Sequence, residues 1–247
     1  MAVLTPSEVD YQSLAQRQFT LSVIIPCYNE VHTVREVLYR VLDVELAHEI
    51  VIVDDGSTDG TRDVLREVEA EALPGVRVLY HDRNRGKGAA VLTGLAATSS
   101  DVILIQDADF EYDPRDYGRL LRPIEERISP VVYGSRFLNA PRKAMNFWNM
   151  IANKSLLLVA NVLYNSILSD LGTCYKVFRR DLIADMVIEA QGFEFEAEFT
   201  ARILKTGTRI YEVPISYNGR EWSEGKKIRW VDGLRQFWTL LKYRFVD

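Results

Sequence analysis

Short apolar segments alternate with helical patterns along the first half of this chain, and this alternation constrains its fold most. Strand-like segments are expected at 21–25, 49–53, 76–80, 102–105 and 131–133. Helical patterns follow the first four of them, up to about residue 46 and then at 61–72, 87–97 and 114–127. Strands that alternate with helices in this way form right-handed βαβ units. We therefore predict an α/β fold with a mostly parallel central sheet flanked by helices.

The size and composition are those of a soluble globular protein. The chain has 247 residues, of which 47% are hydrophobic and 26% charged, with a net charge of −5. We expect an N-terminal extension at 1–18, followed by one large domain at 19–247. Cys27 and Cys174 give neither a disulfide framework nor metal-ligand spacing, and we expect no secretory signal. These features favour a cytoplasmic protein with free thiols.

A long apolar helical pattern spans 147–168, close to the length of a membrane span. It is interrupted by Lys154 and by four asparagines, Asn149, Asn153, Asn161 and Asn165. Charged and amide groups are costly in a bilayer, so we predict a buried or interfacial helix here. We expect no transmembrane segment.

The C-terminal segment has an amphipathic pattern. One helical face carries Trp230, Leu234, Phe237, Trp238, Leu241 and Phe245, while Arg235, Lys242 and Arg244 lie off it. Such a helix can lie in a membrane interface, but packing on the domain's own core produces the same stripe. The basic residues between 220 and 244 suggest a surface that meets phosphate or an anionic membrane.

Two acids follow the expected strand at 102–105. The segment VILIQDADFEYDP places Asp107 and Asp109 directly after it, with one small residue between them. Ligands of open α/β sheets bind beyond the carboxyl ends of the strands. Two acids without a local basic neighbour suit a hard divalent cation, which in turn holds a phosphate. The alternative is an ordinary solvated turn, because Asp and Pro also form turns.

Three further loops carry groups suited to a nucleotide. Residues 26–30 (PCYNE) offer an aromatic face, and the acids of 54–61 (DDGSTDGT) can accept hydrogen bonds from a ribose and a base. Residues 84–88 (NRGKG) add main-chain N–H groups and Lys87 at a helix start. They form neither a Walker A loop nor a GxGxxG fingerprint. Together with the acid pair, they indicate a nucleotide site with a metal ion.

These motifs resemble family 2 glycosyltransferases with the GT-A fold, through PCYNE, VIVDDGSTDGT, NRGKG, QDADFEYDP and YGSRF. The polyprenyl-phosphate sugar synthases, of the dolichyl-phosphate mannose/glucose synthase type, are the nearer resemblance. It is carried by DLGTCYKVFRR, FEAEFTARI and EVPISYNGREWSEGKKI. The resemblance covers about 19–244. It implies one GT-A catalytic domain, in which 19–135 bind the nucleotide sugar and 136–247, with amphipathic helices, bind the acceptor.

The resemblance also implies roles for residues on the donor side. The base and ribose would be held by Pro26, Tyr28, Glu30, Val53 and Asp55. Mg²⁺ or Mn²⁺ would sit on Asp107 and Asp109 and bridge the diphosphate. Glu111 would lie nearby as a further metal ligand, where the synthases often have Gln.

On the acceptor side, the resemblance implies cations that meet the acceptor or leaving-group phosphate. These are Arg136, Arg220 and Lys226, with Lys227 as a further candidate. Asn218 stands where many relatives have His.

The implied reaction moves a hexose from a UDP- or GDP-linked donor to a polyprenyl phosphate, with inversion. A lipid phosphate is already ionised and needs no general base. A hydroxyl acceptor, in polysaccharide or glycolipid synthesis, is the main alternative and would need a base. Asp170 is then the first candidate, with Glu196 or Glu198 behind it. A third interpretation is a non-catalytic nucleotide-sugar-binding protein.

Expected partners follow from the same reasoning. They are a nucleoside-diphosphate sugar, a polyprenyl phosphate, and a membrane surface or membrane partner protein, without nucleic acid. Attachment to the cytoplasmic face of the membrane would be peripheral. The sequence leaves homo-oligomer formation, the sugar and the nucleotide open.

Overall fold

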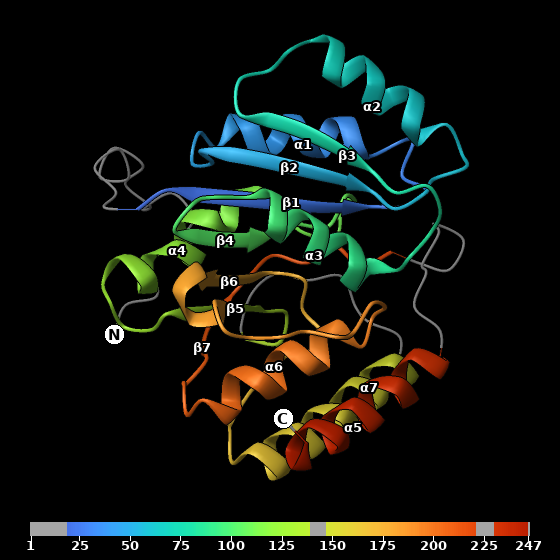
Figure 1. Ribbon diagram of the computed structural model, residues 1–247. Coiled ribbons are helices and arrows are strands. Elements are labelled where there is room, and N and C mark those ends of the chain that lie inside the picture. Colours follow the sequence, from blue (N-terminus) through green and yellow to red (C-terminus); the bar gives the residue numbers. More distant parts are fainter. Residues whose placement is uncertain (1–18, 139–146, 221–229, 247) are drawn as a thin grey trace.

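The computed structural model describes residues 19–138, 147–220 and 230–246. All five predicted strands are present, and two more join them in one sheet (Figure 1). The strands are β1 (Leu21–Cys27), β2 (Glu49–Asp54), β3 (Val76–Tyr80), β4 (Val102–Ile105), β5 (Val131–Ser135), β6 (Lys176–Arg179) and β7 (Tyr211–Pro214). The helices are α1 (Val34–Asp43), α2 (Thr61–Ala70), α3 (Lys87–Ala97), η3 (Pro114–Asp116), α4 (Tyr117–Glu125), α5 (Phe147–Tyr164), η4 (Arg180–Ile183), α6 (Phe195–Lys205) and α7 (Trp230–Phe245).

Hydrophobic patterning explains the elements of the first half. β1, β2 and β4 are buried along their whole length, which is why they appear in the sequence as nearly continuous apolar runs. α1 buries one face, at Val34, Val37, Leu38 and Val41, and turns its charged residues outward. α3 is built from small residues and lies close against the sheet. At Gly94 a Cβ would lie only 2.4 Å from Cγ2 of Ile24.

The strand order is β3-β2-β1-β4-β6-β5-β7. β1 pairs in parallel with both β2 and β4, while β6 runs antiparallel to its neighbours β4 and β5. The prediction of a mostly parallel sheet flanked by helices is therefore confirmed, with β6 as the exception. The order changes direction at β1, and the carboxyl ends of the strands beside such a change are the usual ligand position in open α/β sheets.

The second half contains elements that hydrophobic periodicity did not reveal. β6 and β7 have four residues each, and α6 lies between them in sequence. The predicted 147–168 helix exists as α5 but ends at Tyr164, because Asn165 adopts a positive φ of 49°. The amide of Asn161 then bonds both main-chain groups of Leu168. One of the predicted polar interruptions thus fixes the turn after α5.

α5, α6 and α7 share a small core of their own, apart from the sheet. Its buried residues are Leu156, Ala160, Leu171, Ala197, Ala201, Leu240 and Tyr243. α5 and α7 lie side by side at the end of the molecule remote from α2 (Figure 1). Among the described residues, no helix has the length and apolar composition to cross a bilayer.

The aromatic stripe predicted on the last helix faces outward. α7 buries Gln236, Thr239, Leu240 and Tyr243, while Trp230 and Trp238 are 79% and 66% exposed. Leu234, Phe237 and Phe245 are exposed as well. The alternative in which this stripe packs on the domain's own core is therefore wrong.

Candidate active site

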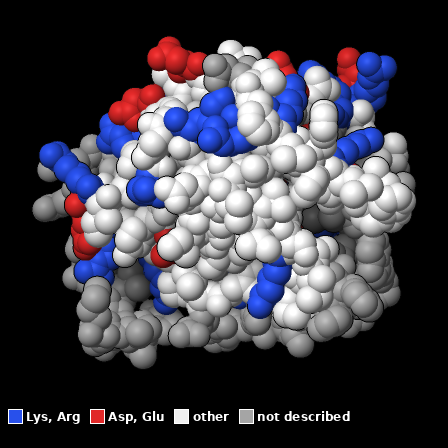
Figure 2. Space-filling model, turned by 90° about the horizontal axis from the view of Figure 1, so that it is seen from below, with Lys and Arg blue, Asp and Glu red and all other residues white. Residues whose placement is uncertain are grey.

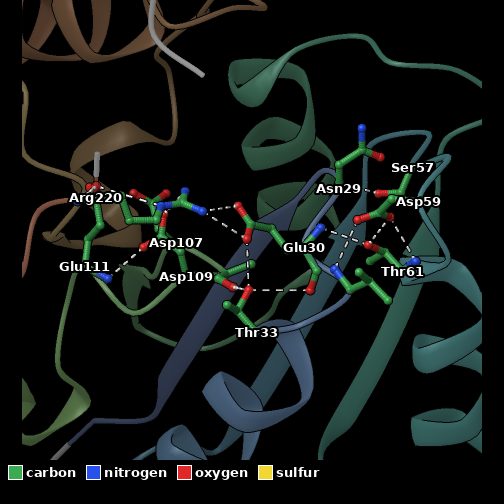
Figure 3. Close-up of polar contacts among 12 residues, drawn as sticks. Asn29, Glu30, Thr33, Ser57, Asp59, Thr61, Asp107, Asp109, Glu111 and Arg220 are labelled. Atoms are coloured by element: carbon green, nitrogen blue, oxygen red, sulfur yellow. Dashed lines mark hydrogen bonds and ion pairs between the residues drawn. The ribbon is translucent and has the colours of Figure 1, made fainter. Parts of the chain in front are cut away.

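The carboxyl ends of three adjacent strands bring the predicted loops together. Ile24 of β1 is paired with Ile105 of β4, and Pro26 with Val53 of β2. The residues that follow these positions therefore emerge at one edge of the sheet. Four carboxylates from this edge form what we call the acidic cluster: Glu30, Asp107, Asp109 and Glu111 (Figure 3).

The two aspartates of the cluster lie in contrasting surroundings. Asp107 Oδ1 is 2.8 Å from Nζ of Lys87, whose positive charge outweighs burial and lowers the pKa of Asp107. Burial and the negative charge of Asp107 raise the pKa of Asp109 to about 7. The two side chains are therefore close enough to repel each other, and this edge of the sheet favours binding of a cation.

Buried hydrogen bonds fix the main chain that carries these acids. Gln106 is fully buried, and its Oε1 accepts hydrogen bonds from the hydroxyls of Tyr117 and Tyr175, each at 2.8 Å. Its amide donates to the Asp107 carbonyl at 2.9 Å. Thr33 donates from Oγ1 to the Ala108 carbonyl at 2.7 Å. Sequence reasoning missed Gln106 and Thr33, because no local pattern links them to such distant partners.

The acid pair fits a divalent ion that takes part of its ligands from substrate. Among the described residues, no three His, Cys, Asp or Glu side chains form a ready metal cluster. Mg²⁺ commonly takes only one or two protein carboxylates and completes its shell with phosphate and water. Asp107 and Asp109 provide this number of carboxylates.

Glu111 lies near the acid pair and also contacts residues 217–220. Its Oε1 accepts the main-chain N–H of Arg220 at 2.7 Å, and its Oε2 accepts the hydroxyl of Tyr217 at 3.0 Å. Its carbonyl accepts the N–H of Asn218 at 2.9 Å. Glu111 thus holds residues 217–220 against the acidic cluster, and its role as a metal ligand stays a prediction.

Arg220 lies within the acidic cluster. Its guanidinium contacts Asp109, and Nη1 is 3.1 Å from Oε1 of Glu30 (Figure 3). Oε1 of Glu111 lies 3.9 Å from its Nε. The structure therefore brings Arg220, from the predicted acceptor half, to the predicted metal position.

The predicted nucleotide-binding residues all lie at this edge, with different degrees of exposure. Tyr28 is half-buried, whereas Pro26 and Val53 are buried strand residues whose side chains belong to the interior. Asp55 is also buried, and it accepts the N–H groups of Arg85 and Gly86 at 2.8 Å each.

A ring nitrogen of His81 also lies 2.7 Å from the Asp55 carboxylate. The contacts of Asp55 thus shape the 84–88 loop, and its direct contact with a nucleotide stays a prediction. Lys87 belongs to the same loop. Burial alone would lower the pKa of its ammonium group, but the nearby carboxylate of Asp107 outweighs this effect and raises the pKa well above its usual value. Lys87 also lies 3.4 Å from Oε1 of Glu196.

The three candidate general bases are all held in ion pairs. Asp170 binds the guanidinium of Arg136 in a bidentate pair, with N–O distances of 2.7 and 2.8 Å. Glu196 contacts the fully buried Lys176 as well as Lys87. Glu198 accepts two main-chain N–H groups and pairs with Arg202 at 2.7 Å.

The structure gives the predicted phosphate-binding cations unequal access. Arg136 is only 7% exposed, and its donors face Asp170, so its contact with a phosphate stays a prediction. Lys226 and Lys227, like the predicted extension at 1–18, lie outside the described residues.

Comparison with known proteins shows the family to which this chain belongs. The model of the family described as "Glycosyl transferase family 2" matches residues 22–186. An undecaprenyl-phosphate mannosyltransferase of Micrococcus luteus is 32% identical over 82% of this chain and 85% of its own length. A polyprenol monophosphomannose synthase of Mycolicibacterium smegmatis is 27% identical, over 81% of this chain and 77% of its own. A dolichol-phosphate mannosyltransferase of Pyrococcus furiosus is 28% identical, over 90% and 64%.

The fold has solved relatives. The crystal structure of glucosyl-3-phosphoglycerate synthase from Mycobacterium tuberculosis, in complex with Mn²⁺, UDP and phosphoglyceric acid, superposes with a TM-score of 0.72. It is 20% identical and is matched over 100% of this chain and 85% of its own. This similarity confirms the predicted GT-A fold. Because the family model covers most of the chain and the Micrococcus luteus relative is similar over most of both lengths, the chain belongs to glycosyl transferase family 2 and is a glycosyltransferase.

Proposed function

We propose that this protein transfers a hexose from a nucleoside-diphosphate sugar to a polyprenyl phosphate, with inversion at the anomeric carbon and with a divalent cation. One observation carries the proposal: two carboxylates meet at the sheet edge, while every candidate general base is already ion-paired. A phosphate acceptor attacks as an anion and needs no base, whereas a sugar hydroxyl needs one. The mannosyltransferases named above support the same acceptor class.

In the proposed reaction, positive charge at the donor end of the site would stabilise the departing diphosphate. A metal ion held by Asp107 and Asp109 would neutralise charge that develops on the departing diphosphate. Mn²⁺ or Mg²⁺ accompanies UDP in the solved structures of the glucosyl-3-phosphoglycerate synthase, which supports this choice. Lys87, held between Asp107 and Glu196, points an ammonium group toward the same place. Gln106 and Thr33 keep the aspartate loop fixed while charge moves.

The proposed reaction is tested with radiolabelled nucleotide sugar and purified polyprenyl phosphate, followed by extraction with organic solvent. We expect label in the lipid phase that mild acid releases. Label that resists mild acid and alkali would indicate a hydroxyl acceptor and contradict the proposal.

A variant pair tests the metal site. Asp109→Asn should lower turnover at least about a hundredfold, the scale for loss of one group that stabilises transition-state charge. Asp113→Asn is the matched control, because Asp113 lies on the same segment but pairs with the exposed Arg115. Equal activity of the two variants would exclude Asp109 as a metal ligand. A thermal-shift panel of UDP- and GDP-sugars with Mn²⁺ would identify the donor.

We also propose that the exposed apolar side chains of α5 and α7 rest on an anionic membrane surface. They are Leu158, Val162, Trp230, Leu234, Phe237, Trp238 and Phe245, and we call them the α5–α7 face. Figure 2, seen from below, shows a broad area of uncharged side chains with scattered lysines and arginines. Tryptophans and cations together favour an interfacial position.

Flotation with anionic liposomes at low salt tests this attachment. Trp238→Ser should reduce the floating fraction, whereas Ile128→Ser, at an exposed residue beside β5, should not. Wild-type protein that stays wholly in the dense fraction would contradict the proposal.

A further inference from the structure

Arg220 occupies the place that a bound cation would need. Its guanidinium contacts the carboxylates of Asp109 and Glu30, both of which are at most 8% exposed. Its Nη2 bonds Asp109 Oδ2, and its Nη1 is 3.1 and 3.2 Å from the two oxygens of Glu30. The same arginine is anchored through its main-chain N–H on Glu111. Arg220 thus bridges three members of the acidic cluster.

The fit of Arg220 is incomplete. Its Nε–H is buried and has no hydrogen-bond acceptor among the described residues, since Oε1 of Glu111 lies 3.9 Å away. A buried donor without a partner costs free energy. Arg220 and Lys87 together supply two positive charges to a site with four carboxylates. The contact therefore compensates the acidic cluster only in part, and a better cation can replace it.

We propose that Arg220 is a built-in counter-cation that holds the acidic cluster together before donor binding and must leave Asp109 when the metal ion and diphosphate arrive. This proposal rests on the metal site of the proposed function. It makes Arg220 an autoinhibitory contact, because Asp109 cannot bind the guanidinium and a metal ion in the same place. The released guanidinium would pair with a phosphate, for which its planar fork is suited.

The proposal makes binding of metal and nucleotide interdependent. Metal alone must displace Arg220 without giving it a new partner, whereas metal with UDP provides a diphosphate for it. Coupling between two ligands commonly changes affinity by about 5- to 150-fold. We therefore expect weak Mn²⁺ binding to the wild-type protein and much tighter binding in the presence of UDP.

A charge-conserving variant separates displacement from a simple charge effect. Arg220→Lys keeps the positive charge but lacks the fork that reaches both Glu30 and Asp109. Displacement predicts that this variant binds Mn²⁺ without nucleotide about tenfold more tightly than the wild type, a factor within the usual range of coupling. A simple charge effect predicts no change. Mn²⁺ binding is measured by loss of the free-ion electron paramagnetic resonance signal, with and without UDP.

Lys87→Gln is the second comparison, because it removes a charge beside Asp107 and leaves Arg220 in place. It should raise Mn²⁺ affinity without UDP whether or not Arg220 is displaced, and therefore gives the size of a pure charge effect at the acid pair. Melting temperatures without metal, compared with the wild type, show that each variant is folded.

The outcomes distinguish the two proposals. Equal Mn²⁺ affinity of Arg220→Lys and the wild type, with UDP still enhancing both, would overturn the counter-cation and leave the proposed function intact. No Mn²⁺ binding by the wild type or by either variant, with or without UDP, would overturn the metal site and the counter-cation together.

Discussion

Glu49 lies at the end of the sheet opposite the acidic cluster and ties three segments together. Its Oε1 accepts the Ser22 hydroxyl at 2.6 Å, and the main-chain N–H groups of Ser99 and Ser100 at 2.6 and 3.0 Å. Its Oε2 is 2.7 Å from Arg77. Burial by itself would raise the pKa of Glu49, but these hydrogen bonds outweigh it and lower the pKa to about 2.

The size of the effect follows from proton linkage. A fall from 4.5 to about 2 corresponds, at roughly 1.4 kcal/mol for each pH unit, to about 3 kcal/mol of folding free energy from the ionised form. Because the folded pKa is lowered, this stabilisation is fully present above pH 4.5 and is lost as the pH falls toward 2. Glu49→Gln should therefore destabilise the protein by about 3 kcal/mol at pH 7. The difference from the wild type should shrink as the pH falls below 4.5.

Urea unfolding at several pH values, followed by circular dichroism, measures this difference. Glu36→Gln is the matched control, since Glu36 pairs with Arg40 on the surface of α1, and such pairs contribute only about 0.3–0.5 kcal/mol. A Glu49→Gln effect below about 1 kcal/mol at pH 7, or one that is constant between pH 3 and pH 7, would refute the reasoning. Turnover by the folded variant should be unchanged, because Glu49 lies outside the site.

Three further predictions concern buried residues. Lys176→Met leaves Glu196 without its buried partner, so it should cost about 3–5 kcal/mol in urea unfolding, and a cost near zero would contradict the ion pair. Gly94→Ala should lower stability by about 1–3 kcal/mol, because its Cβ would lie 2.4 Å from Ile24, and an unchanged melting temperature would disprove this contact. Burial and the charge of Asp107 raise the pKa of Cys174, so alkylation at pH 8 should be slow until urea unfolds the protein; rapid native labelling of Cys174 would disagree.

The first half of the fold could be predicted because its hydrophobic pattern is local. β3, α3 and β4 have the expected bounds, since buried parallel strands need continuous apolar runs and their helices need a 3.6-residue period. β6 was not predicted, because its burial depends on contacts with residues that are distant in the sequence. Its first residue, Lys176, is fully buried, and its ammonium group is satisfied by the carbonyls of Leu171 and Thr173 and by Glu196 on α6.

The direction in which the aromatic stripe of α7 faces could not be predicted from the sequence either. The sequence predicted an amphipathic helix, but an apolar stripe looks the same whether it faces the protein core or the solvent. Packing against α5 and α6 uses Leu240 and Tyr243, so Trp230 and Trp238 are left outside. The expected division into donor and acceptor halves at 135 stays a prediction, although one sheet contains strands of both.

By itself, the sequence determined the order of the elements in the first half, the sheet edge at which the candidate site lies and the acid pair Asp107 and Asp109. Each of these depends on residues within a few positions of one another. Only the tertiary structure decided how the site is held and which charges are paired. Gln106 meets Tyr175 69 residues away, and Arg220 meets Glu30 190 residues away. Ion pairs and hydrogen bonds act over a few ångströms of space, so partners this distant in sequence are set by the packing of the whole domain.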